Sequence, residues 1–458
     1  MPNSPKKSPL ISSSKSSLKS SLLAGLNKLE QKEKTNYLRN LNNFPQLFRI
    51  RQKFDHPTIS AEQIPTAIDT QLNILHFNEK IKPGETVAIT AGSRGIAHIS
   101  LILKTLVKHF QRIGAQPFIF PAMGSHGGGT LAGQLQILQN YGITEAVLGC
   151  PIKATMEVDL IATTSLGTPV YLDRFAAQAD HIFVVNRVKP HTKFSGKVES
   201  GLMKMCLIGM GKCKGAQIYH RAAERYTWDR VVTTVYEVLN NKIPLLGGLA
   251  LLENAYDEIA LIQALSSDEI PLKEPELLKQ AYLWFPRIPF PEVDLLIVDE
   301  IGKEYSGTGM DTIVVGKKPS APIKVKLLYV RDLTEQTHGN AQGIGFADFT
   351  RRSLVEKIDF KATYLNSQTA FRTQAPKIPM TLANDREVIR IALQMSGYEE
   401  DLHQIRLVWI KNTLELEEMV VSEAYRKQVE NNPNLEILSF KLKMDFTEDG
   451  FLILKDNH

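Results

Sequence analysis

The sequence TVAITAGSRGIAHISLILKTLVKHFQRIG, residues 86–114, opens with a short β-rich run and ends in a glycine. The loop Gly92-Ser93-Arg94-Gly95 follows the β-rich run. The segment after this loop has apolar side chains at helical spacing: Ile99, Ile102, Leu103, Leu106, Val107 and Phe110. The stretch therefore predicts a strand, a loop and a helix in succession.

The same order of elements recurs further along the chain. Residues 117–120 form a second apolar run, which is followed by Gly-Ser-His at 124–126, by Gly127–Gly129 and by a helical segment over 130–141. Residues 179–185 (ADHIFVV) resemble another buried strand, and this strand leads to a Lys-Pro-His sequence. Strands that alternate with helices predict a parallel sheet covered on both faces.

Three charged or titratable side chains follow the predicted strands directly: Arg94, His126 and His191. Open α/β sheets bind ligands outside the carboxyl ends of their strands. We therefore expect these side chains to meet at one rim of the sheet. One cation and two imidazoles at one rim suit an acidic substrate and proton transfer.

At 458 residues the chain is too long for one ordinary core, and we expect two α/β domains with mainly parallel sheets covered by helices. The active site is expected in the cleft between them. The proline-dense sequence WFPRIPFP at 284–291 is a plausible hinge. The predicted divisions are a flexible basic, serine-rich tail over 1–45, an N-terminal cofactor-binding and catalytic domain over 46–283, a smaller C-terminal domain over 284–410, and a C-terminal helix and strand over 411–458. Within the C-terminal half, strands are predicted over 293–298, 323–330 and 405–410, and helices over 387–395 and 415–429.

Composition narrows the class of protein. Hydrophobic residues at 43% and charged residues at 22% are globular averages, which excludes a wholly disordered, collagen-like or coiled-coil chain. The net charge of +5 is low for a nucleic-acid-binding body. Three cysteines are too few for a disulfide framework, and no run of about 20 apolar residues predicts a membrane span. We expect a cytoplasmic protein that binds neither nucleic acid nor membrane; the sequence sets no oligomeric state.

Three side chains beyond the first loop have two interpretations each. His191 either acts as an acid and base near neutral pH or is a surface side chain in a polar loop. Lys204 lies in an apolar segment, so it either extends to solvent or is buried with a lowered pKa and a nucleophilic amine. His220, at the start of a helical segment, is either satisfied by backbone groups or a metal ligand, and it is a ligand only if a cofactor supplies the remaining donors. The triple glycine is a weak phosphate-binding signal, because it lacks the Lys and Ser/Thr of a P-loop.

Taken together, these segments resemble the nickel-dependent lactate racemase family, well over residues 84–225 and only by the order of elements elsewhere. The family has an arginine after its first strand, a Gly-Ser/Thr-His loop, a histidine after a later strand, then a lysine and another histidine. This sequence supplies, in that order, Arg94, His126, His191, Lys204 and His220. The separations of 126 − 94 = 32 and 220 − 204 = 16 residues also match the family.

The resemblance implies a racemase or epimerase of a 2-hydroxy acid that works by reversible hydride transfer to a nickel pincer nucleotide. It implies that Lys204 tethers this cofactor covalently and that His220 is the protein's nickel ligand. His126 and His191 would be acid–base catalysts on opposite faces of the substrate, a role worth about 10²–10⁴-fold in rate. Arg94 would bind the substrate carboxylate.

Several positions depart from the family pattern. Ala91 stands where the family often has an aspartate, and the gap of 204 − 191 = 13 residues is longer than in the lactate enzyme. Lys303 and Glu304 follow a later strand, and they are the nearest equivalents of a polar pair from the second domain. Lactate is therefore no more expected than another 2-hydroxy acid or a sugar acid. A non-catalytic protein of the same fold that binds an anion or nucleotide is the alternative, whereas an NAD-dependent dehydrogenase would need a GxGxxG sequence after the first strand.

Overall fold

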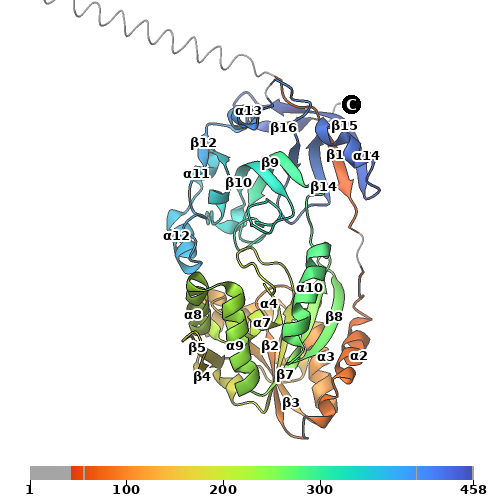
Figure 1. Ribbon diagram of the computed structural model, residues 1–458, viewed down its shortest axis with the longest axis vertical. Coiled ribbons are helices and arrows are strands. Elements are labelled where there is room, and N and C mark those ends of the chain that lie inside the picture. Colours follow the sequence, from red (N-terminus) through yellow and green to blue (C-terminus); the bar gives the residue numbers. More distant parts are fainter. Residues whose placement is uncertain (1–42, 55–56, 399, 456–458) are drawn as a thin grey trace, which may run out of the picture.

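The computed structural model describes residues 43–54, 57–398 and 400–455, and it contains two domains, each built on its own twisted sheet (Figure 1). The fold is mixed α/β with mostly parallel sheets flanked by helices, which confirms the predicted fold class. In the described part of the chain no helix is long and apolar enough to cross a membrane. The thiols of Cys150, Cys206 and Cys213 are all free.

The first domain contains a five-stranded sheet in which neighbouring strands are parallel except for the last pair. Its strands, in spatial order, are β3 (Gln116–Pro121), β2 (Thr86–Ala91), β6 (His181–Arg187), β7 (Leu245–Glu253) and β8 (Ile259–Ser266). A separate hairpin joins β4 (Val158–Thr163) to β5 (Pro169–Asp173).

Helices cover both faces of this sheet because successive strand residues point to opposite sides. Val87 and Ile89 pack with α2 (Ile64–Ile74) and α3 (Ile99–Arg112), whereas Ala88 belongs to the core on the other face. The remaining helices of this domain are α4 (Leu131–Asn140), α5 (Glu145–Leu148), α6 (Arg174–Ala177), α7 (Leu202–Lys204), α8 (Lys212–Arg225), α9 (Trp228–Lys242) and α10 (Ile270–Trp284).

The second domain contains a nine-stranded sheet that is parallel in one half and antiparallel in the other. Its strands, in spatial order, are β12 (Met380–Leu382), β11 (Phe349–Arg351), β10 (Lys324–Leu333), β9 (Glu292–Ile301), β13 (Leu407–Ile410), β14 (Glu418–Ser422), β1 (Leu47–Gln52), β15 (Leu435–Phe446) and β16 (Leu452–Lys455). Its helices are α11 (Arg352–Glu356), α12 (Phe360–Thr369), α13 (Asp385–Ser396) and α14 (Arg426–Glu430).

Two expectations about the chain's organisation are wrong. Strand β1, assigned above to the N-terminal domain over 46–283, lies between β14 and β15 in the second domain, where Figure 1 draws it in orange among blue strands. The helix predicted over 415–429 is instead strand β14 followed by the short helix α14. Both errors have one cause: the Met-Val-Val run at 419–421 and strand β1 pair with each other across more than 350 residues, which local spacing does not reveal. The predicted tail over 1–45 falls almost wholly outside the described residues.

The chain therefore crosses between the domains twice. One crossing is the predicted proline-dense break, which lies between α10 and β9. The other lies between Lys53, whose N–H donates to Asn434 in the second domain, and Ile59, whose N–H donates to Ile259 in the first. A hinge at these crossings remains a proposal.

Phe48→Ala tests the placement of β1. Phe48 is fully buried in the core of the second domain, so its removal should cost about 3–5 kcal/mol of unfolding free energy. Amide hydrogen exchange should accelerate in Leu295–Val298 and stay unchanged in Val87–Ile89. If exchange accelerated only in Val87–Ile89, β1 would belong to the first domain instead.

Candidate functional site

Three neighbouring strands position the predicted catalytic and substrate-binding side chains. The order β3-β2-β6 is parallel throughout, so the carboxyl ends of these strands lie at one edge of the sheet. His126 follows β3, Arg94 follows β2 and His191 follows β6. The structure thus brings the three side chains to the same rim.

A cavity of about 800 Å³ lies between this rim and the second domain. Arg94, His191, Lys204 and His220 line it from the first domain. The loop after β9, including Glu304–Thr308, lines it from the second domain. Of the five predicted residues, His126 alone lies outside the cavity wall, but its neighbours in space include Arg94, Lys204, His220 and Lys303.

His126 is held by a side chain that sequence reasoning missed. Its Nδ1 atom forms a hydrogen bond with the hydroxyl of Ser93, the residue immediately before Arg94. The ring keeps access to solvent, yet the surrounding protein and the nearby cations lower the pKa of His126 to about 4. The imidazole is therefore neutral at pH 7 and available to accept a proton. The sequence signal that could have identified Ser93 was its position in the Gly-Ser-Arg-Gly loop at 92–95.

His191 is fixed in one orientation by its own turn. Its Nδ1 atom accepts hydrogen bonds from the backbone N–H groups of Lys193 and Phe194, each at 3.0 Å. In the neutral ring the proton must therefore reside on Nε2. Burial and the Lys204 ammonium hold the pKa of His191 well below its usual range. This imidazole is a neutral Nε2–H donor at physiological pH.

Lys204 lies at the end of α7 and immediately before a π-helical segment, Met205–Gly209. Such segments are frequent at functional sites. The buried carboxylate of Glu274 accepts the N–H of Met203 at 2.9 Å and so caps the helix that carries Lys204. Burial, followed by the nearby Arg94, lowers the pKa of Lys204 to about 7. About half of the amine is therefore uncharged at neutral pH, as a nucleophilic lysine requires.

His220 has an unsatisfied nitrogen. It lies on α8, and its ring stacks on Phe194 with centroids 5.4 Å apart. Its Nδ1 atom is buried and makes no hydrogen bond to any residue that the structure describes. Burial, then the charge of Lys204, lowers the pKa of His220 to about 4, so the ring is in the neutral form that binds metals.

The donor set fits a metal held mainly by a cofactor. Within residues 43–54, 57–398 and 400–455, no three His, Cys, Asp or Glu side chains converge to form a complete metal site. A neutral histidine with an unsatisfied nitrogen and a half-neutral lysine line the same cavity. One nitrogen ligand and one covalent attachment point are what a tethered, metal-bearing group requires from the protein.

Further cations surround the Arg94 guanidinium, which is exposed to the cleft. Lys303 donates to the carbonyl of Gly307 and to Asn366, and its pKa is lowered to about 8 by burial and by Arg94. Burial also lowers the pKa of Lys189 to about 8. Neither lysine forms an ion pair with a carboxylate among the described residues, which leaves both available to an anionic substrate.

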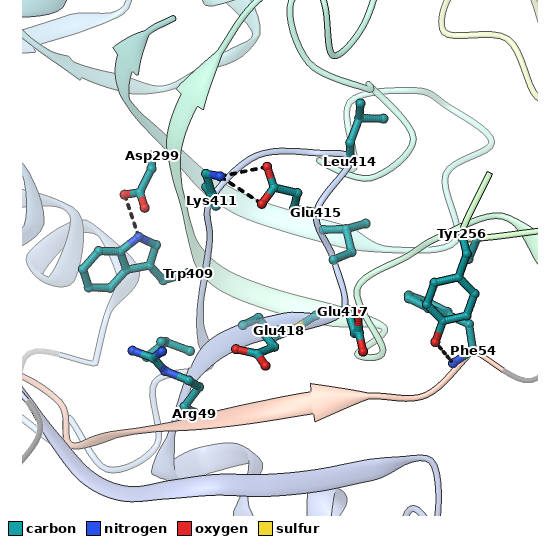
Figure 2. Close-up of a pocket in the computed structure, with 14 residues that line it drawn as sticks. Arg49, Phe54, Tyr256, Asp299, Trp409, Lys411, Leu414, Glu415, Glu417 and Glu418 are labelled. Atoms are coloured by element: carbon teal, nitrogen blue, oxygen red, sulfur yellow. Dashed lines mark hydrogen bonds and ion pairs between the residues drawn. The ribbon is translucent and has the colours of Figure 1, made fainter. Parts of the chain in front are cut away.

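A second cavity, of about 540 Å³, lies beside the antiparallel half of the second sheet (Figure 2). Some of its polar side chains pair with one another, as Figure 2 shows. Lys411 bonds both oxygens of Glu415 at 2.9 Å, and the indole N–H of Trp409 donates to Asp299 at 2.7 Å. It contains none of the predicted site residues, so the interdomain cavity is the candidate active site.

Lys204 should be the most reactive lysine toward a limiting amount of acetic anhydride at pH 7. At this pH an ordinary lysine, with a pKa of about 10.4, is uncharged in fewer than about one molecule in a thousand. Peptide mass spectrometry should find Lys204 acetylated first, at a rate that rises as pH increases through about 7. The exposed Lys197 is the internal control. Earlier labelling of Lys197 would contradict a buried, half-neutral Lys204.

Comparison with known proteins shows similarity in the N-terminal domain and in the fold. Residues 40–228 match the family model described as the lactate racemase N-terminal domain. The fold is similar to that of the lactate racemase apoprotein from Thermoanaerobacterium thermosaccharolyticum, with 13% identity and a TM-score of 0.51 over 76% of this chain and 92% of that one. A protein from Thermotoga maritima has 14% identity and a TM-score of 0.47 over 79% of this chain and 99% of that chain. A search of curated proteins found no match. Residues 40–228 thus match a lactate racemase N-terminal domain, and the fold of the chain is similar to that of a lactate racemase apoprotein.

Proposed function

We propose that this protein is an isomerase that racemises or epimerises a 2-hydroxy acid by reversible hydride transfer, with a nickel pincer nucleotide attached to Lys204. One observation carries the proposal: three neutral histidines lie around the half-neutral amine of Lys204. The charge of Lys204 contributes to the lowered pKa of His126, His191 and His220 alike. All four groups are therefore close in space and in the protonation states that the reaction requires.

Two side chains would hold the cofactor. The Lys204 amine would form the covalent link, and the unsatisfied nitrogen of His220 would be the protein's nickel ligand. When bound, the cofactor supplies an electron-poor ring that accepts the hydride from the substrate's Cα.

The remaining side chains would bind the substrate and move its proton. Arg94 would pair with the carboxylate, with Lys303 and Lys189 adding positive charge nearby. His126 would accept the hydroxyl proton, because its ring is neutral. His191 would face the same oxygen from the other side as an Nε2–H donor. These contacts support unequal starting roles for the two histidines. Three free thiols support a reducing, cytoplasmic setting.

The cofactor assignment is tested by mass and metal content in a host that makes the cofactor. Wild-type protein should carry a covalent mass addition, which Lys204→Ala should lose and Lys197→Ala should keep. His220→Ala should keep the addition and lose most of its nickel, because one donor is removed. An unmodified wild-type protein that still binds hydroxy acids would favour the alternative, a non-catalytic binding protein.

The reaction class is tested by racemisation in heavy water. A Cα–H beside a carboxylate is a very weak acid, and the described residues offer no cluster of metal-binding side chains that would stabilise an enolate. Hydride transfer keeps the original hydrogen on Cα, so mass spectrometry should find little deuterium in the product after many turnovers. Near-stoichiometric deuterium at Cα from the first turnovers would establish proton abstraction instead.

A further inference from the structure

A buried ion pair joins the two domains behind the candidate active site. Lys318, in the segment between β9 and β10, donates to both carboxylate oxygens of Glu199 at 2.8 and 2.7 Å. Its Nζ atom also lies 2.8 Å from the hydroxyl of Tyr282, which in turn donates to Glu199. The side chains of Lys318 and Glu199 are only 1% and 3% exposed. Lys318 belongs to the second domain, whereas both of its partners belong to the first.

The carboxylate of Glu199 connects this pair to His191. Its Oε2 atom accepts the backbone N–H of His191 at 2.7 Å and the ammonium of Lys318 at the same time. The backbone N–H of Lys189 donates to the carbonyl of Ser200 at 2.8 Å, which keeps the two segments paired. A displacement of the Glu199 carboxylate would therefore change the position of the His191 backbone.

Other contacts from the second domain hold the same turn. Thr312 and Arg372 both donate to the carbonyl of Thr192, at 2.7 and 3.1 Å. Lys193 donates to the carbonyl of Ala370 at 2.8 Å. The N–H groups that orient the His191 ring belong to this same turn. The orientation of the ring thus depends on a turn that the second domain holds in place.

We infer that Lys318 is a positioning residue that couples closure of the interdomain cleft to the placement of His191. Because Lys318 and Glu199 belong to different domains, the pair can form only when the domains close. In an open cleft both charges would be hydrated. Desolvation roughly offsets the attraction in a buried pair, which makes such a contact a better determinant of geometry than of stability. The inference rests on the proposed function only for the catalytic role of His191.

The test uses full-length protein without cofactor and compares Lys318→Met with Lys317→Met. Lys317 is the adjacent residue, but it pairs with Asp348 within the second domain. Lys318→Met should accelerate amide exchange over residues 189–201 by about tenfold or more. It should also shift the ¹⁵N resonance of His191 Nδ1, which reports the two amide hydrogen bonds. Lys318→Arg should restore most of both signals, and Lys317→Met should match wild type.

Unchanged exchange and an unchanged His191 resonance in Lys318→Met would overturn the inference. Exchange in Val87–Ile89 and Leu295–Val298 verifies that each variant is folded. If Lys318→Met does not fold, Glu199→Gln gives the same test, because glutamine still accepts the His191 N–H but loses the ion pair. If the wild type proves inactive on every 2-hydroxy acid tested, the proposed function fails, whereas these readouts still decide the role of Lys318. In active enzyme, kcat/KM should fall in Lys318→Met and recover in Lys318→Arg.

Discussion

Parallel pairing of β3, β2 and β6 is the constraint on which the rest of the site depends. Because these neighbouring strands run in one direction, the loops that leave them meet at one edge. Arg94, His126 and His191 are more than thirty residues apart in sequence, and only this topology brings them together. The π-helical segment after Lys204 and the helix that carries His220 then complete the same cavity wall.

Low hydration gives this cluster its chemistry. Burial removes water from the ionisable groups and so disfavours their charged forms. Lys204 and the three histidines are all basic groups, and each would also repel the charge of its neighbours. The result is three neutral imidazoles and a half-neutral lysine at pH 7, beside the permanently charged Arg94. Neutral nitrogens can bind a metal, form a covalent bond or accept a proton, whereas their protonated forms cannot.

The sequence was sufficient for the three strands that position the site, β3, β2 and β6, because their signals are local, whereas β7 and β8 were not predicted. Strand–loop–helix units such as 86–114 contain their own periodicity, and the ends of their strands predict a shared rim. The second sheet was harder, since β1 finds its partners only near the end of the chain. Ser93 and Glu199 were missed for a similar reason. Each matters through one hydrogen bond to a histidine, and that bond depends on tertiary contacts that spacing does not encode.

The two domains contribute different chemistry to the cavity. The first domain supplies all of the neutral nitrogen groups, while the second supplies Lys303 and the loop containing Tyr305, Ser306 and Thr308. Closure of such a cleft excludes water and strengthens every electrostatic interaction within it. A substrate would therefore contact the rim of the first sheet on one side of the cavity and the hydrogen-bonding loop after β9 on the other. Loops tolerate substitution better than the ends of buried strands, because fewer packing contacts depend on them. Under the proposed function, preference among 2-hydroxy acids is consequently expected to be determined by the loop after β9, with the reaction itself determined by the first domain.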